Sequence, residues 1–178
     1  ALDAMGTSNV YGSFEFNYNQ RMLYGVYPVE DGASIARYDF EQDGIYYLKQ
    51  GNEVTVTQRD HNYNCYSGTV NIPATVTHNG ETYRVTTIGH DAFRDCDKVT
   101  SVTIPSSVTR IENTAFRNCI SLSYIHFGSK IKSVGKSAFM VCRVLETVEV
   151  DDLIGWCSID FEDYASSPLT YAKHFILG

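Results

Sequence analysis

The stretch "NTAFRNC", Asn113 to Cys119, decides the fold because the chain repeats it. "HDAFRDC" stands upstream at 90–96 and "KSAFMVC" downstream at 136–142, and each copy keeps Ala-Phe, two variable residues and Cys. The three phenylalanines are 23 residues apart, and so are the three cysteines. A fixed period of about 20 to 50 residues is the sequence mark of a solenoid or a propeller.

Apolar residues recur with the same period elsewhere in the repeats. Five more columns keep it: Val85, Val108 and Ile131; Ile88, Ile111 and Val134; Val99, Leu122 and Leu145; Val102, Ile125 and Val148; Ile104, Phe127 and Val150. In the middle repeat, Val99, Val102 and Ile104 have the spacing of a short strand that Pro105 ends. Ala115 and Phe116 are predicted to lie in a single helical or 3₁₀ turn. One repeat cannot bury its apolar face alone, so stacked repeats are predicted to share one core.

Composition and charge limit the kind of partner. The chain has 178 residues, 43% of them hydrophobic, which suits one domain or a short repeat array. A net charge of −7 and the lack of a basic run argue against nucleic acid or an anionic membrane surface as the main partner. No apolar stretch approaches the roughly 18 residues that span a bilayer, so membrane insertion is not expected.

The repeats resemble a known family. "VTSVTIPSSVTRIENTAFRNC" and "LSYIHFGSKIKSVGKSAFMVC" fit the signature of the BspA-like leucine-rich repeats, which occur in bacterial, especially Bacteroidetes, surface proteins. The second copy has Phe127-Gly128 where Ile-Pro is usual. The resemblance implies an α/β leucine-rich-repeat solenoid that is strand-rich, with one short helical or 3₁₀ turn per 23-residue repeat. It also implies an extracellular or cell-surface location, although no signal segment is present in the sequence.

The repeat pattern also divides the chain. Residues 1–43 form an N-terminal segment that the pattern does not explain, and its opening "ALDAMGTS" reads as residues added by cloning or as the remainder of a targeting segment. Residues 44–178 are the predicted repeat domain. Within it, 44–82 form a β-hairpin cap and a split first repeat, with hairpin signals at Gly51-Asn52 and Asn79-Gly80. Residues 83–150 are regular repeats, and 151–178 are a divergent C-terminal repeat expected to act as a cap.

The five cysteines do not indicate a metal site or a disulfide framework. Cys96, Cys119 and Cys142 share one column, so their side chains should be parallel on successive rungs, which is unsuitable for disulfides. They are predicted to be buried free thiols, whereas Cys65 and Cys157 lie in the two irregular ends and are not expected to pair with each other. "HNYNC" at 61–65 has one His and one Cys without a second pair, which falls short of a zinc site.

Catalytic motifs are also absent from the sequence. There is no G-x-S-x-G, H-E-x-x-H or phosphate-binding loop. Two adjacent carboxylate pairs, at 151–152 and 162–163, are interpreted as solvated surface. Neither an enzyme nor a cofactor is therefore predicted.

Binding residues are expected on the exposed face of the strand column, predicted to be concave, because inward and outward side chains alternate along a strand. Thr69 and Asn71 begin this ladder, and the candidate ligand-binding residues are Ser101, Thr103, Tyr124, His126, Thr147 and Glu149. Tyr124 and His126 are its large members, and tyrosine is enriched at binding hot spots.

The function predicted from the resemblance is a secreted or cell-surface protein-binding module of the adhesion type. Its partner would be a host extracellular-matrix or cell-surface protein. Two alternatives stay open at this point. The array could be a structural spacer without a ligand, or it could bind a glycan, for which a row of exposed aromatic residues would be expected.

Overall fold

A computed structural model describes residues 38–60 and 65–178. These residues belong to a compact unit that runs from Arg37 to Gly178. The predictions for residues 1–37, and for His61 in the weak "HNYNC" motif, lie outside the described residues.

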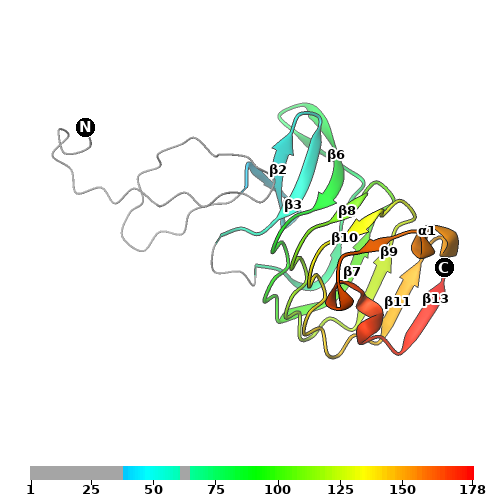
Figure 1. Cartoon of the computed structure of the whole chain (residues 1–178). Coiled ribbons are helices and arrows are strands. Elements are labelled where there is room, and N and C mark those ends of the chain that lie inside the picture. The colour runs from blue at the N-terminus through cyan, green and yellow to red at the C-terminus, as the bar shows by residue number, and fades with distance from the viewer. Residues whose placement is uncertain (1–37, 61–64) are drawn as a thin grey trace, which may run out of the picture. The chain divides into compact units, whose positions relative to one another are not determined.

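Two sheets form this unit, and both run along the array (Figure 1). The five-stranded sheet has the order β13-β11-β9-β7-β4, and all of its pairs are parallel. Its strands are β4 (Ser67–Asn71), β7 (Lys98–Ile104), β9 (Tyr124–Phe127), β11 (Thr147–Val150) and β13 (His174–Leu177).

The eight-stranded sheet has the order β1-β2-β3-β6-β8-β10-β12, with β5 paired to β6 off this path. Its strands are β1 (Phe40–Gln42), β2 (Ile45–Gln50), β3 (Glu53–Thr57), β5 (Thr75–His78), β6 (Glu81–Ile88), β8 (Arg110–Ile111), β10 (Ser133–Val134) and β12 (Asp160–Phe161). Each regular repeat therefore contributes one strand to each sheet, as the two apolar edges of the 23-residue period predict. The solenoid fold predicted from the sequence is confirmed.

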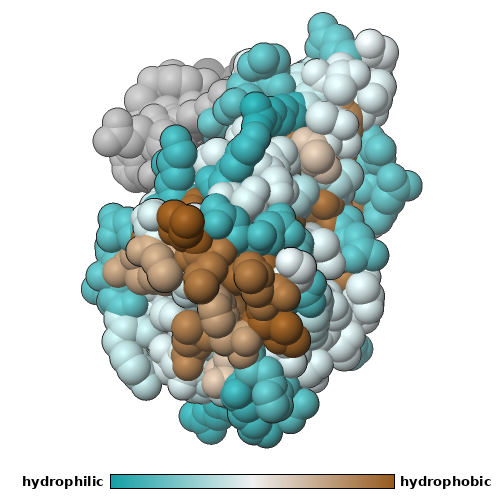
Figure 2. All heavy atoms as spheres, turned by 90° about the vertical axis from the view of Figure 1, so that its right-hand side faces the viewer, coloured by the Kyte–Doolittle hydropathy of each residue, from teal (hydrophilic) through white to brown (hydrophobic). Residues whose placement is uncertain are grey.

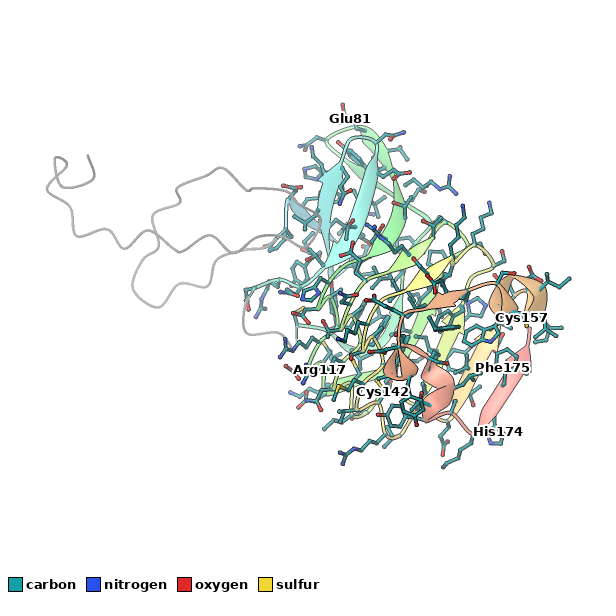
Figure 3. All side chains as sticks on the ribbon, in the orientation of Figure 1. Glu81, Arg117, Cys142, Cys157, His174 and Phe175 are labelled. Atoms are coloured by element: carbon teal, nitrogen blue, oxygen red, sulfur yellow. The ribbon has the colours of Figure 1, made fainter. Side chains whose placement is uncertain are left out.

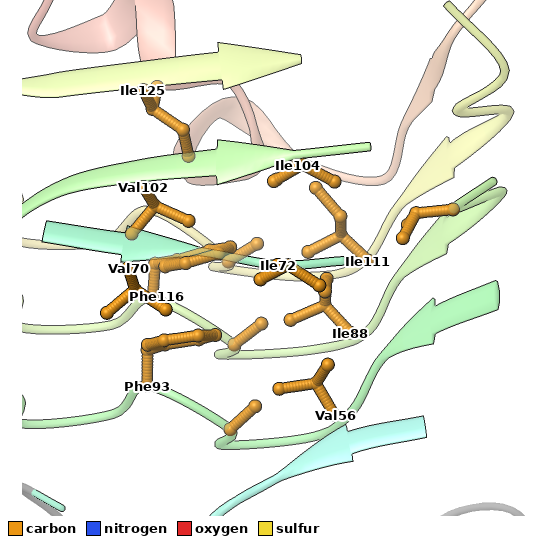
Figure 4. Close-up of a cluster of buried hydrophobic side chains, with 14 of the residues drawn as sticks. Val56, Val70, Ile72, Ile88, Phe93, Val102, Ile104, Ile111, Phe116 and Ile125 are labelled. Carbon is orange, nitrogen blue, oxygen red and sulfur yellow. The ribbon is translucent and has the colours of Figure 1, made fainter. Parts of the chain in front are cut away.

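The core lies between the sheets and is built from the repeated columns (Figure 4). Phe93, Phe116 and Phe139 are fully buried and stack face to face, with ring centroids 4.9 and 5.0 Å apart. Tyr66 packs on Phe93 at 4.4 Å and so begins the same aromatic row. The predicted phenylalanine ladder is therefore present and starts one rung earlier, with a tyrosine from outside the A-F-x-x-C motif.

The A-F-x-x-C segments form short hydrogen-bonded turns, as the predicted single turn per repeat requires. Their bonds join residues three apart, with Arg94 N–H donating to Asp91 O and Cys96 N–H to Phe93 O. Asp91 and Asp95 both have positive φ, of 56°, as Thr114 and Asn118 do in the next repeat. Because these left-handed residues flank each turn, the turns do not extend into a longer helix.

Both predicted hairpins are present at the N-terminal end of the array. β2 pairs with β3 and β5 with β6, each antiparallel, and Asn79 and Gly80 have the positive φ values of a type I′ turn. β3 then pairs with β6 in parallel and extends the eight-stranded sheet. β1 pairs with β2, so the folded unit begins before the predicted boundary at residue 44. That these hairpins act as a cap stays a prediction.

The C-terminal residues form a lengthened last rung. After β11 the chain makes helix α1 (Leu153–Cys157) and the 3₁₀ segments η2 (Tyr164–Ser166) and η3 (Pro168–Thr170) before β13. Val148 pairs with Phe175 and Val150 with Leu177, so this divergent repeat returns to the sheet four residues later than the regular period. Figure 2 shows exposed apolar surface on this side of the molecule, where Phe175, Leu177 and Ile154 of α1 are 40%, 58% and 80% exposed.

Candidate functional site

The predicted ladder lies on the exposed face of the five-stranded sheet. Ser101 pairs with Tyr124 and Tyr124 with Thr147; in the next column Thr103 pairs with His126 and His126 with Glu149. Thr69 and Asn71 continue the two columns onto β4. These side chains are exposed or half-buried, whereas Val102, Ile125 and Val148 between them are fully buried. The structure therefore brings all six candidate residues together, as the strand alternation predicts.

A fifth rung extends the ladder beyond the predicted residues. His174 pairs with Thr147, and Ile176 pairs with Glu149, so both columns end on β13 (Figure 3). Both side chains are exposed. The sequence carried the signal for them, because alternation around the inward-facing Phe175 and Leu177 places residues 174 and 176 on the outer face.

Tyr124 is held to the next rung by a hydrogen bond. Its hydroxyl donates to Oε2 of Glu149 at 2.8 Å. Loss of solvent around the hydroxyl, together with this bond, raises the pKa of Tyr124 to about 12. The phenol is thus a neutral donor at physiological pH, and its ring is fixed against a carboxylate, which is an acceptor only.

His126 is tied to the residue that follows the neighbouring strand. Its Nε2 lies 2.9 Å from Oδ1 of Asp151, whose Oδ2 accepts from Ser106 Oγ at 2.9 Å and from Ser129 N–H at 3.2 Å. Desolvation alone would raise the pKa of Asp151, but the bonds from Ser106 and His126 lower it overall. Asp151 therefore joins three successive rungs through hydrogen bonds at one edge of the face.

The two carboxylate pairs interpreted as solvated surface also have specific partners. Asp151 has the contacts described above, and Asp152 caps α1 by accepting from Ile154 N–H and Gly155 N–H, both at 3.0 Å. In the second pair, Glu162 accepts from Lys136 N–H and Asp163 from Ser137 N–H, again at 3.0 Å. The four carboxylates lie at the surface as interpreted, with Asp151 and Glu162 exposed, but their partners come from the local helix cap or from a neighbouring rung, which the sequence does not show.

The network at Asp151 contains the residue types of a hydrolase triad but not its geometry. Ser106 donates to Asp151 and not to His126, so the histidine does not receive the hydroxyl proton. A nucleophilic serine needs a base within hydrogen-bonding reach, and a carboxylate of lowered pKa is a poor one. This geometry supports positioning of side chains and not acyl transfer.

No cluster of three or more metal-ligating side chains occurs in residues 38–60 and 65–178. Over the same residues, no helix is both long and apolar enough to cross a membrane.

The predicted cysteine column is buried, with Cys96, Cys119 and Cys142 each 0% exposed. The thiol of Cys119 donates to Phe93 O at 3.0 Å, and that of Cys142 to Phe116 O at 3.1 Å. Sequence reasoning missed that Cys65, placed in an irregular end, reaches this column and contacts Cys96.

Comparison with known proteins agrees with the repeat geometry. Residues 86–157 match the family model described as "BspA type Leucine rich repeat region (6 copies)". Residues 86–157 therefore carry BspA-type leucine-rich repeats. No curated protein matches it in sequence.

Solved leucine-rich-repeat structures are similar to the chain. A protein from Bacteroides ovatus is 27% identical, with a TM-score of 0.55 over 79% of this chain and 41% of its own. A protein from Bacteroides capillosus is 25% identical, with a TM-score of 0.60 over 78% of this chain and 98% of its own. The chain thus spans less than half the length of the first and nearly all of the second.

A leucine-rich cell surface protein from Faecalibacterium prausnitzii has the same fold. It is 23% identical, with a TM-score of 0.53 over 84% of this chain and 44% of its own. This likeness shows that the two chains share the leucine-rich-repeat fold.

Proposed function

We propose that this BspA-type array is a protein-binding module of a cell-surface or secreted protein, and that its partner binds the exposed face of the five-stranded sheet. The observation that carries the proposal is the fixed ladder at Tyr124 and His126. Both side chains are hydrogen-bonded to carboxylates of the next rung, so they present a surface that is already ordered.

An ordered surface favours binding because less side-chain entropy is lost on association. Tyr124 supplies ring area together with a polar group, the combination that is enriched at binding hot spots. Its cross-strand partners, Ser101 and Thr147, have small hydroxyl side chains, and Tyr124 itself is half-buried. By contrast, Arg110 on the eight-stranded sheet is an exposed charge paired with Glu112 at 2.8 Å, and such pairs contribute little.

The test measures binding of the purified chain to a panel of extracellular-matrix and cell-surface proteins, with a glycan panel in parallel. Against a partner found in this way, Tyr124→Ala should lower the affinity by more than about 1 kcal/mol, and Arg110→Ala should not. Tyr124→Phe keeps the ring and removes the bond to Glu149, so it separates the contribution of ring area from that of positioning.

Each other outcome contradicts the proposal in a distinct way. An effect of Arg110→Ala alone would place the site on the eight-stranded sheet. Binding to glycans without any protein partner would favour the glycan alternative, and no binding to either panel would favour the spacer. Unfolding midpoints of the variants control for loss of structure.

A further inference from the structure

Cys96 differs from the other two cysteines of its column in what lies next to its thiol. Cys119 and Cys142 each donate to the carbonyl of the phenylalanine one rung before. For Cys96 the preceding rung has no A-F-x-x-C motif, and residues 65–66, directly before β4, take that place. The side chains of Cys65 and Cys96 interact there, so that each shifts the pKa of the other thiol.

The register of the neighbouring strands is a second, independent reason to place Cys65 beside Cys96. β4 and β7 pair in parallel, with Ser67 opposite Lys98. Cys65 and Cys96 each precede these partners by two residues, so continuing the register toward the N-terminus of both strands places them at the same level of adjacent chain segments. Neighbouring strands are about 4.8 Å apart, within the Cα separation of about 4.4 to 6.8 Å that a disulfide spans.

The objection to disulfides within the column does not apply to this pair. Parallel Cβ directions follow from identical backbone paths, and residues 65–66 do not follow the path of 96–97. Tyr66 is buried and stacks on Phe93, whereas Asp97 at the same level is half-exposed. Cys65 is half-exposed where Cys96 is fully buried. Buried and exposed side chains thus alternate in opposite order along residues 65–66 and 96–97, so the Cβ directions of Cys65 and Cys96 need not be parallel.

We propose that Cys65 and Cys96 form a disulfide when the chain meets a disulfide-bearing oxidant, and that the bond clamps the segment before β4 to the first regular rung. The thiolate of Cys65 attacks one sulfur of the oxidant and forms a mixed disulfide, releasing one thiol. Cys96 then loses its proton and attacks the sulfur of Cys65, releasing the second thiol. Two cysteines are oxidised by two electrons, and one disulfide is reduced to two thiols.

The surroundings of the two sulfurs fit these roles. The contact with Cys96 lowers the pKa of Cys65, and Arg59 N–H lies 3.5 Å from its sulfur. Cys65 is therefore the accessible thiol that reacts first. The same contact, followed by burial, raises the pKa of Cys96. Once Cys65 is bound to the oxidant, its thiol no longer raises the pKa of Cys96. Cys96 is then already next to the sulfur that it must attack.

The test treats the folded chain with oxidised glutathione and measures intact mass and tryptic peptides. The background is Cys157→Ser, because Cys157 is exposed and would react by itself. The expected product has lost two hydrogens, and the peptide between Arg59 and Arg84 is joined to the peptide between Arg94 and Lys98. Adding Cys65→Ser should abolish the product, while Cys119→Ser, which leaves the pair intact, should preserve it.

Three results would overturn the inference. Unchanged mass, a stable glutathionyl adduct on Cys65, or a link between Cys119 and Cys142 would each show that Cys65 and Cys96 are not the reactive pair. A midpoint of thermal unfolding that falls on oxidation and recovers with a thiol reductant would contradict the clamping role, because a cross-link should raise it.

Discussion

The next-to-last rung and the last rung have the same side-chain pattern, yet only the next-to-last rung is buried. Val148 and Val150 of β11 are 0% and 2% exposed, whereas Phe175 and Leu177, their partners on β13, are 40% and 58% exposed. Both pairs point toward the core side of the sheet. The difference shows that a rung is buried by its neighbours on both sides and not by its own apolar residues.

The largest effect should therefore follow from removing an interior phenylalanine. Phe116→Ala leaves a cavity between Phe93 and Phe139 and is expected to cost about 3 to 5 kcal/mol of unfolding free energy. Phe175→Ala on the last rung should cost less than half of that, because part of its ring is already in water. Denaturant unfolding of both variants measures the difference. Equal losses of unfolding free energy in the two variants would contradict the view that a rung is buried by its neighbours.

A glycine between two rungs should give the next largest effect. A Cβ on Gly128 would lie 2.5 Å from Pro105 C and 2.7 Å from Pro105 O, which are backbone atoms of the rung before. Gly128→Ala is expected to destabilise by about 1 to 3 kcal/mol, because the rungs must separate. Gly51 is a matched control, since a Cβ there meets nothing within 4 Å and costs only its positive φ of 66°. Similar losses for both would show that the rungs can separate easily.

The next smaller effect is a loss of stability in acid, which should come from Asp91 in the turn between two rungs. Burial by itself would raise the pKa of Asp91, but the hydrogen bonds from His90 and Thr114 lower it overall. A lowered pKa stabilises the fold above the unfolded value of about 3.9, and this contribution is lost as pH falls through the folded value. The stability gap between wild type and Asp91→Asn should thus narrow below about pH 4. Urea unfolding at several pH values measures the difference in unfolding free energy between the two proteins. A difference that does not change with pH would show that the lowered pKa of Asp91 does not stabilise the fold.

The smallest effect should be a gain in stability at the last regular turn. Asp95 and Asn118 have positive φ, and Val141 holds the same position with φ 69°. Asp and Asn tolerate this conformation, whereas a β-branched residue is strained in it. Val141 N–H donates to the Tyr171 hydroxyl at 3.0 Å, a bond that a substitution would keep. Val141→Asn should raise the unfolding free energy by about 1 kcal/mol. Unchanged or lower stability would mean that the valine side chain contributes more than its backbone strain costs.

Strict repetition explains why the core and the candidate face could be predicted. When every rung repeats one 23-residue path, a column in the sequence becomes a row in space, and the alternation along β9 separates Ile125 from Tyr124 and His126. The buried rows of phenylalanine and cysteine could be predicted for the same reason. The positive φ values of Asp91 and Asp95 beside the A-F-x-x-C turn were not predicted, because they depend on hydrogen bonds between rungs, such as Asp95 N–H to Arg117 O.

The sequence by itself determined the repeat, its two strand edges, the inward columns and both hairpin turns, because each depends on residue type at a fixed spacing. Only the tertiary structure decided which polar groups meet. Asp151 reaches His126, Ser106 and Ser129, and Cys65 reaches Cys96, although no period relates these partners. Outside the period the path of the chain depends on what it packs against, so contacts there are set by the stack of rungs and not by local spacing.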